Sequence, residues 1–141
     1  MLTYSMKKKI LDIIIGRDTE GQTDAYLGLS TTTPTVDGEN FTEPSAENGY
    51  ERVLLGSPKI EVYRMAETVV NPDTNVASSE NEKEIHFNEA SGEWGEVEWF
   101  GIFTSEKEGK PIYIGQLVSK IQPSSLNVVV IRKGDIYISI E

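Results

Sequence analysis

The chain has 141 residues, no cysteine and a net charge of −10, from 13 basic and 23 acidic residues. A chain of this length can fold as one domain around a single core, and the lack of cysteine excludes a disulfide framework, a thiolate metal site and a cysteine nucleophile. Because the acidic surface repels phosphate groups, we expect neither nucleic acid nor an anionic membrane as a partner.

The first sixteen residues predict a short helix that ends at Gly16, with Ser5 as the candidate N-terminal cap. Three isoleucines share one helix face at i, i+3 and i+4 spacing: Ile10, Ile13 and Ile14. Two interpretations of this face stay open, since it can pack on the chain's own domain or dock on a neighbouring subunit. The apolar run is too short for a signal sequence or a membrane span, so we expect the helix to stay on the mature protein.

From Ala25 onward the sequence is typical of β-structure. Residues 25–32 alternate in hydrophobicity, with Ala25, Leu27 and Leu29 on one side. Further strands are expected in residues 50–56, 59–65, 84–88, 97–103, 111–121, 127–133 and 136–141. The residues between 69 and 83 are expected to form a polar loop. Short strands separated by turn signals are typical of all-β sandwiches and barrels.

The predicted fold class is therefore all-β: an antiparallel β-sandwich of the jelly-roll or immunoglobulin-like kind, with a short N-terminal α-helix. We divide the chain into an N-terminal helical segment, residues 1–16, and a single β-sandwich domain, residues 17–141. The sequence contains no internal repeat and no interdomain linker that would favour a second domain.

The segment Thr33–Gly49 predicts a long, ordered surface loop, because it is rich in Pro, Gly, Asn and Asp and has no helical period. Loops of this length without secondary structure are often functional. Phe41 lies within the loop and Tyr50 follows it directly. Aromatic side chains dominate many protein interfaces, so both residues are candidates for contact with a partner.

The most aromatic and acidic stretch is Gly92–Phe103. A strand here places Val97, Trp99, Gly101 and Phe103 on a wholly apolar face, and Glu96, Glu98, Phe100 and Ile102 on the other. Two glutamates at i and i+2 lie near the spacing that a glycosidase uses, but no second element supplies a pocket or a reason for one pKa to rise. A solvated, charged strand edge is the favoured interpretation.

We expect different environments for the two tryptophans of this stretch. Trp99 is expected in the core, whereas Trp94, at the strand entrance, is also open to stacking on a sugar ring, as is an exposed tyrosine such as Tyr63. His86 is the only histidine, so a zinc site is not expected, and the acidic loops lack the spacing of a calcium-binding EF-hand. We therefore expect no catalytic residue, no cofactor and no metal.

Four stretches follow one another in a distinctive order: "KKKILDIIIGRD", "AYLGLSTTTPTVDGENFTEPSAENGYERV", "IHFNEASGEWGEVEWFGIFTSEKEGKPIYIGQL" and "GDIYISIE". Together they resemble a family of small phage and prophage virion structural proteins that are often labelled tail-fibre-like. The resemblance spans most of the chain, and the segment Pro58–Glu82 departs from it.

The resemblance implies a non-enzymatic virion protein that decorates or connects the phage particle through protein–protein contacts. It implies major capsid or tail proteins as partners, a homo-oligomer (a trimer, by analogy with the threefold axes of phage parts), and a place in the virion after synthesis in the bacterial cytoplasm. The expected contact residues are Ile10, Ile13, Ile14, Phe41 and Tyr50. The alternative is a carbohydrate-binding module of a receptor-binding tail fibre, with Trp94 as the stacking residue.

Overall fold

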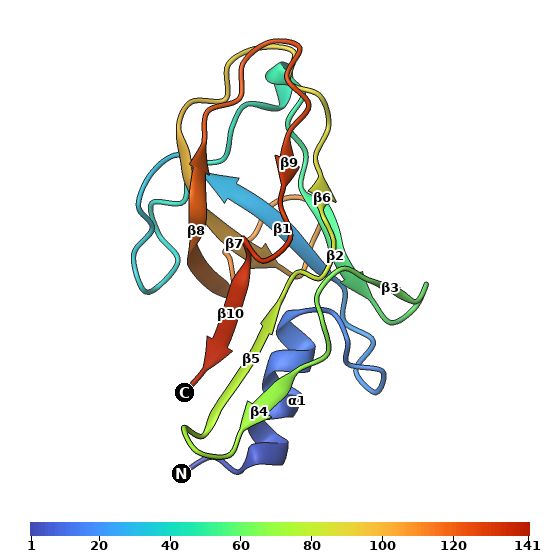
Figure 1. The fold of residues 1–141 in the computed structure, drawn as a ribbon. Coiled ribbons are helices and arrows are strands. Elements are labelled where there is room, and N and C mark those ends of the chain that lie inside the picture. The colour runs from blue at the N-terminus through green and yellow to red at the C-terminus, as the bar shows by residue number, and fades with distance from the viewer.

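The computed structural model describes every residue from Met1 to Glu141 and confirms the all-β fold class with one short N-terminal α-helix. The helix α1 spans Tyr4–Ile14, and a short 3-10 helix spans Ala46–Asn48 (Figure 1). The strands are β1 (Ala25–Ser30), β2 (Val53–Ser57), β3 (Val62–Tyr63), β4 (Val69–Asn71), β5 (Val76–Glu80), β6 (Ile85–His86), β7 (Val97–Phe103), β8 (Tyr113–Ile121), β9 (Val130–Ile131) and β10 (Tyr137–Ile140).

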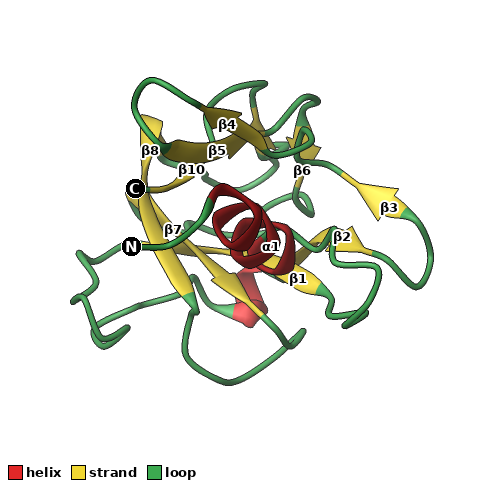
Figure 2. Ribbon diagram, turned by 90° about the horizontal axis from the view of Figure 1, so that it is seen from below, coloured by secondary structure: helices red, strands yellow, loops and turns green.

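The strands form three antiparallel sheets. A five-stranded sheet has the order β3-β2-β1-β7-β8, a three-stranded sheet has the order β10-β5-β4, and β6 pairs with β9. The backbone N–H of Val118 in β8 donates to the carbonyl of Asp135 just before β10 (3.4 Å), which joins the two larger sheets at this edge. Seen from below, α1 stands end-on in the middle of the molecule with strands around it (Figure 2).

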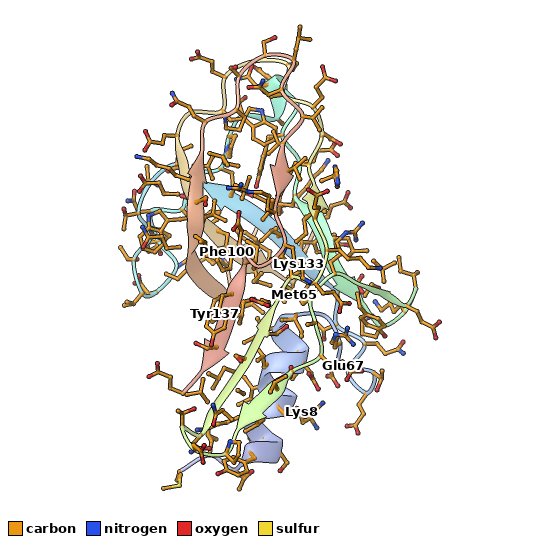
Figure 3. The ribbon with its side chains drawn as sticks, viewed as in Figure 1. Lys8, Met65, Glu67, Phe100, Lys133 and Tyr137 are labelled. Atoms are coloured by element: carbon orange, nitrogen blue, oxygen red, sulfur yellow. The ribbon has the colours of Figure 1, made fainter.

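The core lies between the sheets and under α1. The predicted inward faces of the first and last strands are confirmed: Ala25, Leu27, Leu29, Ile136 and Ile138 are buried, and Ile140 packs against the same cluster. In the centre of the molecule, Phe100 and Met65 are fully buried, whereas Tyr137 points out of β10 (Figure 3).

Strand β7 differs from its prediction. Every second residue from Val97 to Phe103 was expected on one face, but Val97 packs in the core cluster with Phe100 and Ile102. The physical reason is an irregularity in the pairing of β7 with β8, which shifts register between Val97 and Trp99. The prediction that Trp99 is a core residue is also wrong, since this side chain is only half-buried.

The hairpin β4–β5 lies where a polar loop was expected. Asn71 builds its turn: the side-chain oxygen accepts from the backbone N–H groups of Asp73 (2.9 Å) and Thr74 (3.3 Å). In β5 the buried positions are filled by the small residues Ala77 and Ser79. Small residues suffice because α1 packs directly on this hairpin, and their low hydrophobicity conceals the strand in the sequence.

Helix α1 begins two residues earlier than predicted. The hydroxyl of Thr3, not Ser5, accepts from the backbone N–H of Met6 (3.3 Å) and caps the first turn. The predicted end is confirmed, since Gly16 adopts φ +77°. A Cβ on Gly16 would lie 2.3 Å from the carbonyl oxygen of Gly56, so glycine is required where the chain leaves the helix and crosses β2.

Candidate interaction surfaces

The loop between β1 and β2 is fixed to the outer face of the five-stranded sheet by Phe41. The Phe41 ring meets the ring of Phe103 edge-on, with 5.3 Å between centroids. A Cβ on Gly101 would lie 2.8 Å from the Phe41 ring, so the absence of a side chain at this position makes room for it. Phe41 is therefore half-buried, with part of its surface still open to a partner.

Arg52 is the second anchor of this loop. Its Nε and Nη2 donate to the two carboxylate oxygens of Glu43 (2.8 and 2.9 Å), and its Nη1 donates to the carbonyls of Ser105 (3.0 Å) and Glu108 (2.8 Å). A two-pronged pair of this kind fixes both distance and orientation. No local pattern indicates this role of Arg52, because Ser105 and Glu108 lie more than 50 residues from it along the chain and only the fold brings Glu43 to it.

Tyr50 lies in the interior and is only 6 % exposed, so it offers little surface for contact with a partner. Its hydroxyl donates to Glu43 (2.6 Å) and accepts from the backbone N–H of Leu29 (3.0 Å), where β1 runs on past the end of β2. Burial, reinforced by the carboxylate of Glu43, raises the pKa of the Tyr50 phenol. Tyr50 therefore stabilises the base of the loop.

The tip of the same loop is ordered by polar contacts. The hydroxyl of Thr35 donates to Asp37 and holds the pKa of that carboxyl below its usual range. Glu39 forms an ion pair with Lys110, at the start of the segment that leads into β8. These contacts present the fully exposed side chain of Val36 at the tip.

Trp94 is 3 % exposed, so in this structure its ring has no face open to a sugar. Its indole N–H donates to the carbonyl of Asn48 (2.7 Å), and its ring meets Tyr50 edge-on at 5.3 Å. Tyr63 is half-buried, and the guanidinium of Arg17 lies over its ring, 4.7 Å from the centroid. The ring of Trp94 is thus covered by other groups of the chain, whereas Arg17 covers one face of the Tyr63 ring.

The two glutamates considered for catalysis share one cation. The ammonium group of Lys120 lies 2.9 Å from Glu96 and 3.7 Å from Glu98. The hydrogen bond from Lys120 lowers the pKa of Glu96, whereas a general acid needs a raised pKa. The pair therefore has the chemistry of an exposed ion-pair cluster. No group of three His, Asp or Glu side chains is placed to hold a metal ion.

Helix α1 uses two different faces. One face packs inward on β4, β5 and β10 through Lys7, Leu11 and Ile15, with Ile14 against the same core. The predicted packing of the helix on the chain's own body is thus present, but Ile10 and Ile13 lie half-buried on its flank.

The flank of α1 continues towards the start of the chain through Leu2 and Met6, which are both 45 % exposed. Met6, Ile10 and Ile13 follow the i, i+4, i+7 spacing of a helical stripe. Met6 could have been added to the sequence prediction, since it stands one turn before Ile10. The stripe leaves one side of α1 available to a partner.

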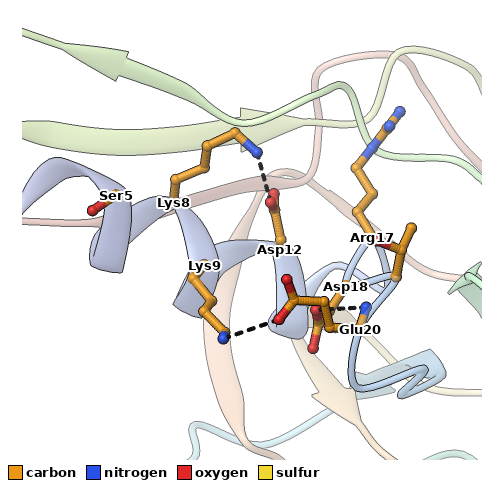
Figure 4. Close-up of a pocket in the computed structure, with 8 residues that line it drawn as sticks. Ser5, Lys8, Lys9, Asp12, Arg17, Asp18 and Glu20 are labelled. Carbon is orange, nitrogen blue, oxygen red and sulfur yellow. Dashed lines mark hydrogen bonds and ion pairs between the residues drawn. The ribbon is translucent and has the colours of Figure 1, made fainter.

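A polar hollow of about 250 Å³ lies between α1 and the loop that follows it (Figure 4). Lys8 pairs with Asp12 (2.7 Å) and Lys9 pairs with Glu20 (3.4 Å) within it. Three basic and three acidic side chains line the hollow, so it has no net charge that would select a charged small ligand. As the only α-helix, α1 falls short of the length and hydrophobicity that a membrane-spanning helix needs.

Comparison with known protein families gives a match that covers nearly the whole chain. A protein-family model described as podophage GP4 fiber I protein gp80 matches residues 1–139. The match runs from the residues before α1 into β10 and includes the loop anchored by Phe41 and Arg52. A search of curated proteins gave no match.

Proposed function

The chain belongs to the family of podophage GP4 fiber I protein gp80, and from this premise we propose that it is a non-enzymatic structural component of a phage fibre. Membership of a phage fibre family makes it a virion-associated structural protein that interacts with other virion components. The finer proposal is that it sits in a fibre, not on the capsid as a decoration, and acts through protein–protein contacts.

The observation that carries this proposal is the apolar surface where α1 begins. Four large apolar side chains are exposed there: Met1 (115 %), Leu2 (45 %), Tyr4 (48 %) and Met6 (45 %). Large apolar side chains exposed together at one end of a molecule often mark a surface that a partner covers.

Two further groups extend the proposed contact surface. Ile10 and Ile13 continue the patch along the flank of α1. In the loop between β1 and β2, the half-buried ring of Phe41 and the exposed side chain of Val36 form a separate contact surface that is already ordered. Because Phe103 and Arg52 hold this loop in place, binding would cost little loop ordering.

Immunogold labelling of intact phage particles tests the proposal. An antibody against the folded chain is expected to label the fibres, and labelling spread over the head would contradict the fibre assignment. Phage that carry the double substitution Leu2→Asp and Met6→Asp are expected to lose the label. Phage with Ile60→Asp, at an apolar site between β2 and β3 that is more exposed (63 %) than Leu2 and Met6, should keep it.

A further inference from the structure

We propose that copies of this chain associate head-to-tail, with the α1 end of one copy docked on the opposite end of the next. The α1 end comprises Met1, Leu2, Tyr4, Met6, Lys8 and Lys9; the opposite end, called the distal end below, comprises residues 87–96 and 121–131. The inference rests on the proposed fibre function and deepens it, by naming a second copy of the chain as the partner.

The α1 end combines apolar and basic groups. Besides its four exposed apolar side chains it carries Lys8 and Lys9, whose side chains are 54 % and 53 % exposed. Residues 1–16 contain three lysines and one aspartate, a net charge of +2 in a chain whose total is −10. The lysines pair with Asp12 and Glu20 at the surface, and exposed pairs of this kind are weak enough to exchange partners.

The distal end combines apolar and acidic groups. Its two segments run side by side, and the backbone N–H of Leu126 donates to the carbonyl of Ala90 (2.7 Å). Leu126 is 78 % exposed and Val128 is 64 % exposed. Val128 lines a hollow of about 280 Å³ whose apolar lining comes from four side chains: Ile121, Val128, Val129 and Val130. This is room for an aliphatic side chain from another molecule.

The distal end is also the acidic partner that the lysines of the α1 end require. Residues 87–96 and 121–131 contain three glutamates and no lysine or arginine. Glu96 is paired with Lys120, whereas Glu89 and Glu93 are exposed and form no ion pair. Glu93 borders a second small hollow that shares Gln122 and Pro123 with the apolar one. Apolar groups and opposite charges thus match between the two ends.

The two ends cannot meet within one copy. Figure 1 places α1 at the bottom of the molecule and the distal loops at the top, with the sheets between them. A contact between unlike surfaces of successive copies is heterologous, and it produces an open string unless a rotation closes it into a ring. Copies joined end to end along the long axis of the molecule would form an elongated assembly, as a fibre requires. Such end-to-end contacts would not exclude a trimer formed by side-to-side contacts.

The isolated contact is expected to be weak. A stable interface covers roughly 800 Å² on each partner, and a handful of half-exposed side chains supplies only part of this area. The rim of lysines and glutamates makes the contact sensitive to salt. Within a particle, additional contacts hold the copies close together and raise their effective concentration.

Sedimentation equilibrium of the full chain tests the inference. The weight-average mass of the wild type is expected to rise between about 10 and about 500 µM, and to rise less at high salt. Met6→Asp blocks the α1 end and Leu126→Asp blocks the distal end, so each variant alone should remain monomeric. An equimolar mixture should form dimers and nothing larger, because each variant keeps one intact end. The control Ile60→Asp should associate as the wild type does.

Three results would overturn the inference. A monomeric wild type at every concentration rules out self-association. Leu126→Asp that associates like the wild type shows that the distal end is not used. Met6→Asp and Leu126→Asp that stay monomeric when mixed show that the contact is not between unlike ends. All substituted residues are exposed, and circular dichroism checks that each variant folds. A monomeric chain that immunogold still places on fibres refutes the inference while leaving the proposed function intact.

Discussion

Arg52 stacks its guanidinium on the ring of Phe103, with Cζ 3.4 Å from the ring centroid, while it binds Glu43 through both carboxylate oxygens. Phe103 belongs to the five-stranded sheet and Glu43 to the loop between β1 and β2. Through these two contacts Arg52 holds the longest loop of the molecule, between β1 and β2, against the five-stranded sheet. The surface of this loop is therefore ordered before a partner binds.

Replacement of Arg52 by leucine is expected to lower the free energy of unfolding by about 2–3 kcal/mol, because it leaves the partly buried Glu43 without its cation and removes the stacking on Phe103. Urea denaturation measures the change. The matched control is Arg132→Leu, whose side chain is 71 % exposed and should alter stability by no more than about 0.5 kcal/mol. Equal effects of the two substitutions would contradict the anchoring role of Arg52.

Asn81 connects the end of β5 to the turn before β10 and is fully buried. Its amide nitrogen donates to the carbonyls of Lys83 (2.8 Å) and Arg132 (2.9 Å), and its side-chain oxygen accepts from the N–H of Ile136 (3.0 Å). Asn81→Ala leaves these buried backbone groups unpaired and should cost about 3 kcal/mol in urea denaturation. The control is Asn88→Ala, at an exposed position, which should change stability little. An effect of Asn81→Ala no larger than that of Asn88→Ala would refute this role of Asn81.

The two faces of α1 are expected to respond differently to truncation. Leu11→Ala removes a fully buried side chain and should cost about 3 kcal/mol of unfolding free energy. Ile13→Ala, on the half-buried flank, should cost less than about 1 kcal/mol. Thermal unfolding of both variants measures the difference, and a larger loss at Ile13 would mean that the flank, not the Leu11 face, holds the helix.

The ion pair between Glu96 and Lys120 predicts a specific pH dependence. The pKa of Glu96 is lowered in the folded chain, so its contribution to stability is present above the ordinary pKa of glutamate and is lost as the pH falls through the lowered value. The pKa of Lys120 is raised, so at the alkaline end the contribution is lost as the pH rises through that raised value.

The corresponding measurement compares the unfolding midpoints of the wild type and Lys120→Met. The wild type should be slightly more stable at about pH 7, and the two midpoints should converge as the pH falls through the lowered pKa of Glu96 and the carboxylate becomes protonated. Both groups are exposed, so added salt should shrink the difference at neutral pH as well. A difference that persists unchanged at low pH would show that it arises from packing of the lysine side chain.

The strands with regular alternation were predictable from sequence. In β1 and β10 the inward positions are aliphatic and mostly leucine or isoleucine, so period two alone identifies both the strand and its buried face. The hairpin β4–β5 was not predictable in this way, because Ala77 and Ser79 fill its buried positions. Its stability depends on contact with α1, which is remote in the sequence.

The candidate surfaces were predictable only in part. The helix and the loop with Phe41 were identified, but periodicity could not decide which isoleucines of α1 face inward, because the apolar arc covers more than half of the helix. The core position of Tyr50 follows from its hydrogen bond to Leu29, which no local pattern indicates. The anchoring role of Arg52 likewise depends on groups that only the folded chain brings together.

The most direct test of the central claim, that this chain is a fibre component, is its copy number per purified particle, measured by quantitative mass spectrometry against the major capsid protein. A fibre component repeats with the symmetry of the fibres, so on the order of tens of copies are predicted. Hundreds of copies, in a fixed ratio to the capsid protein, or absence of the chain from the particle would contradict the claim.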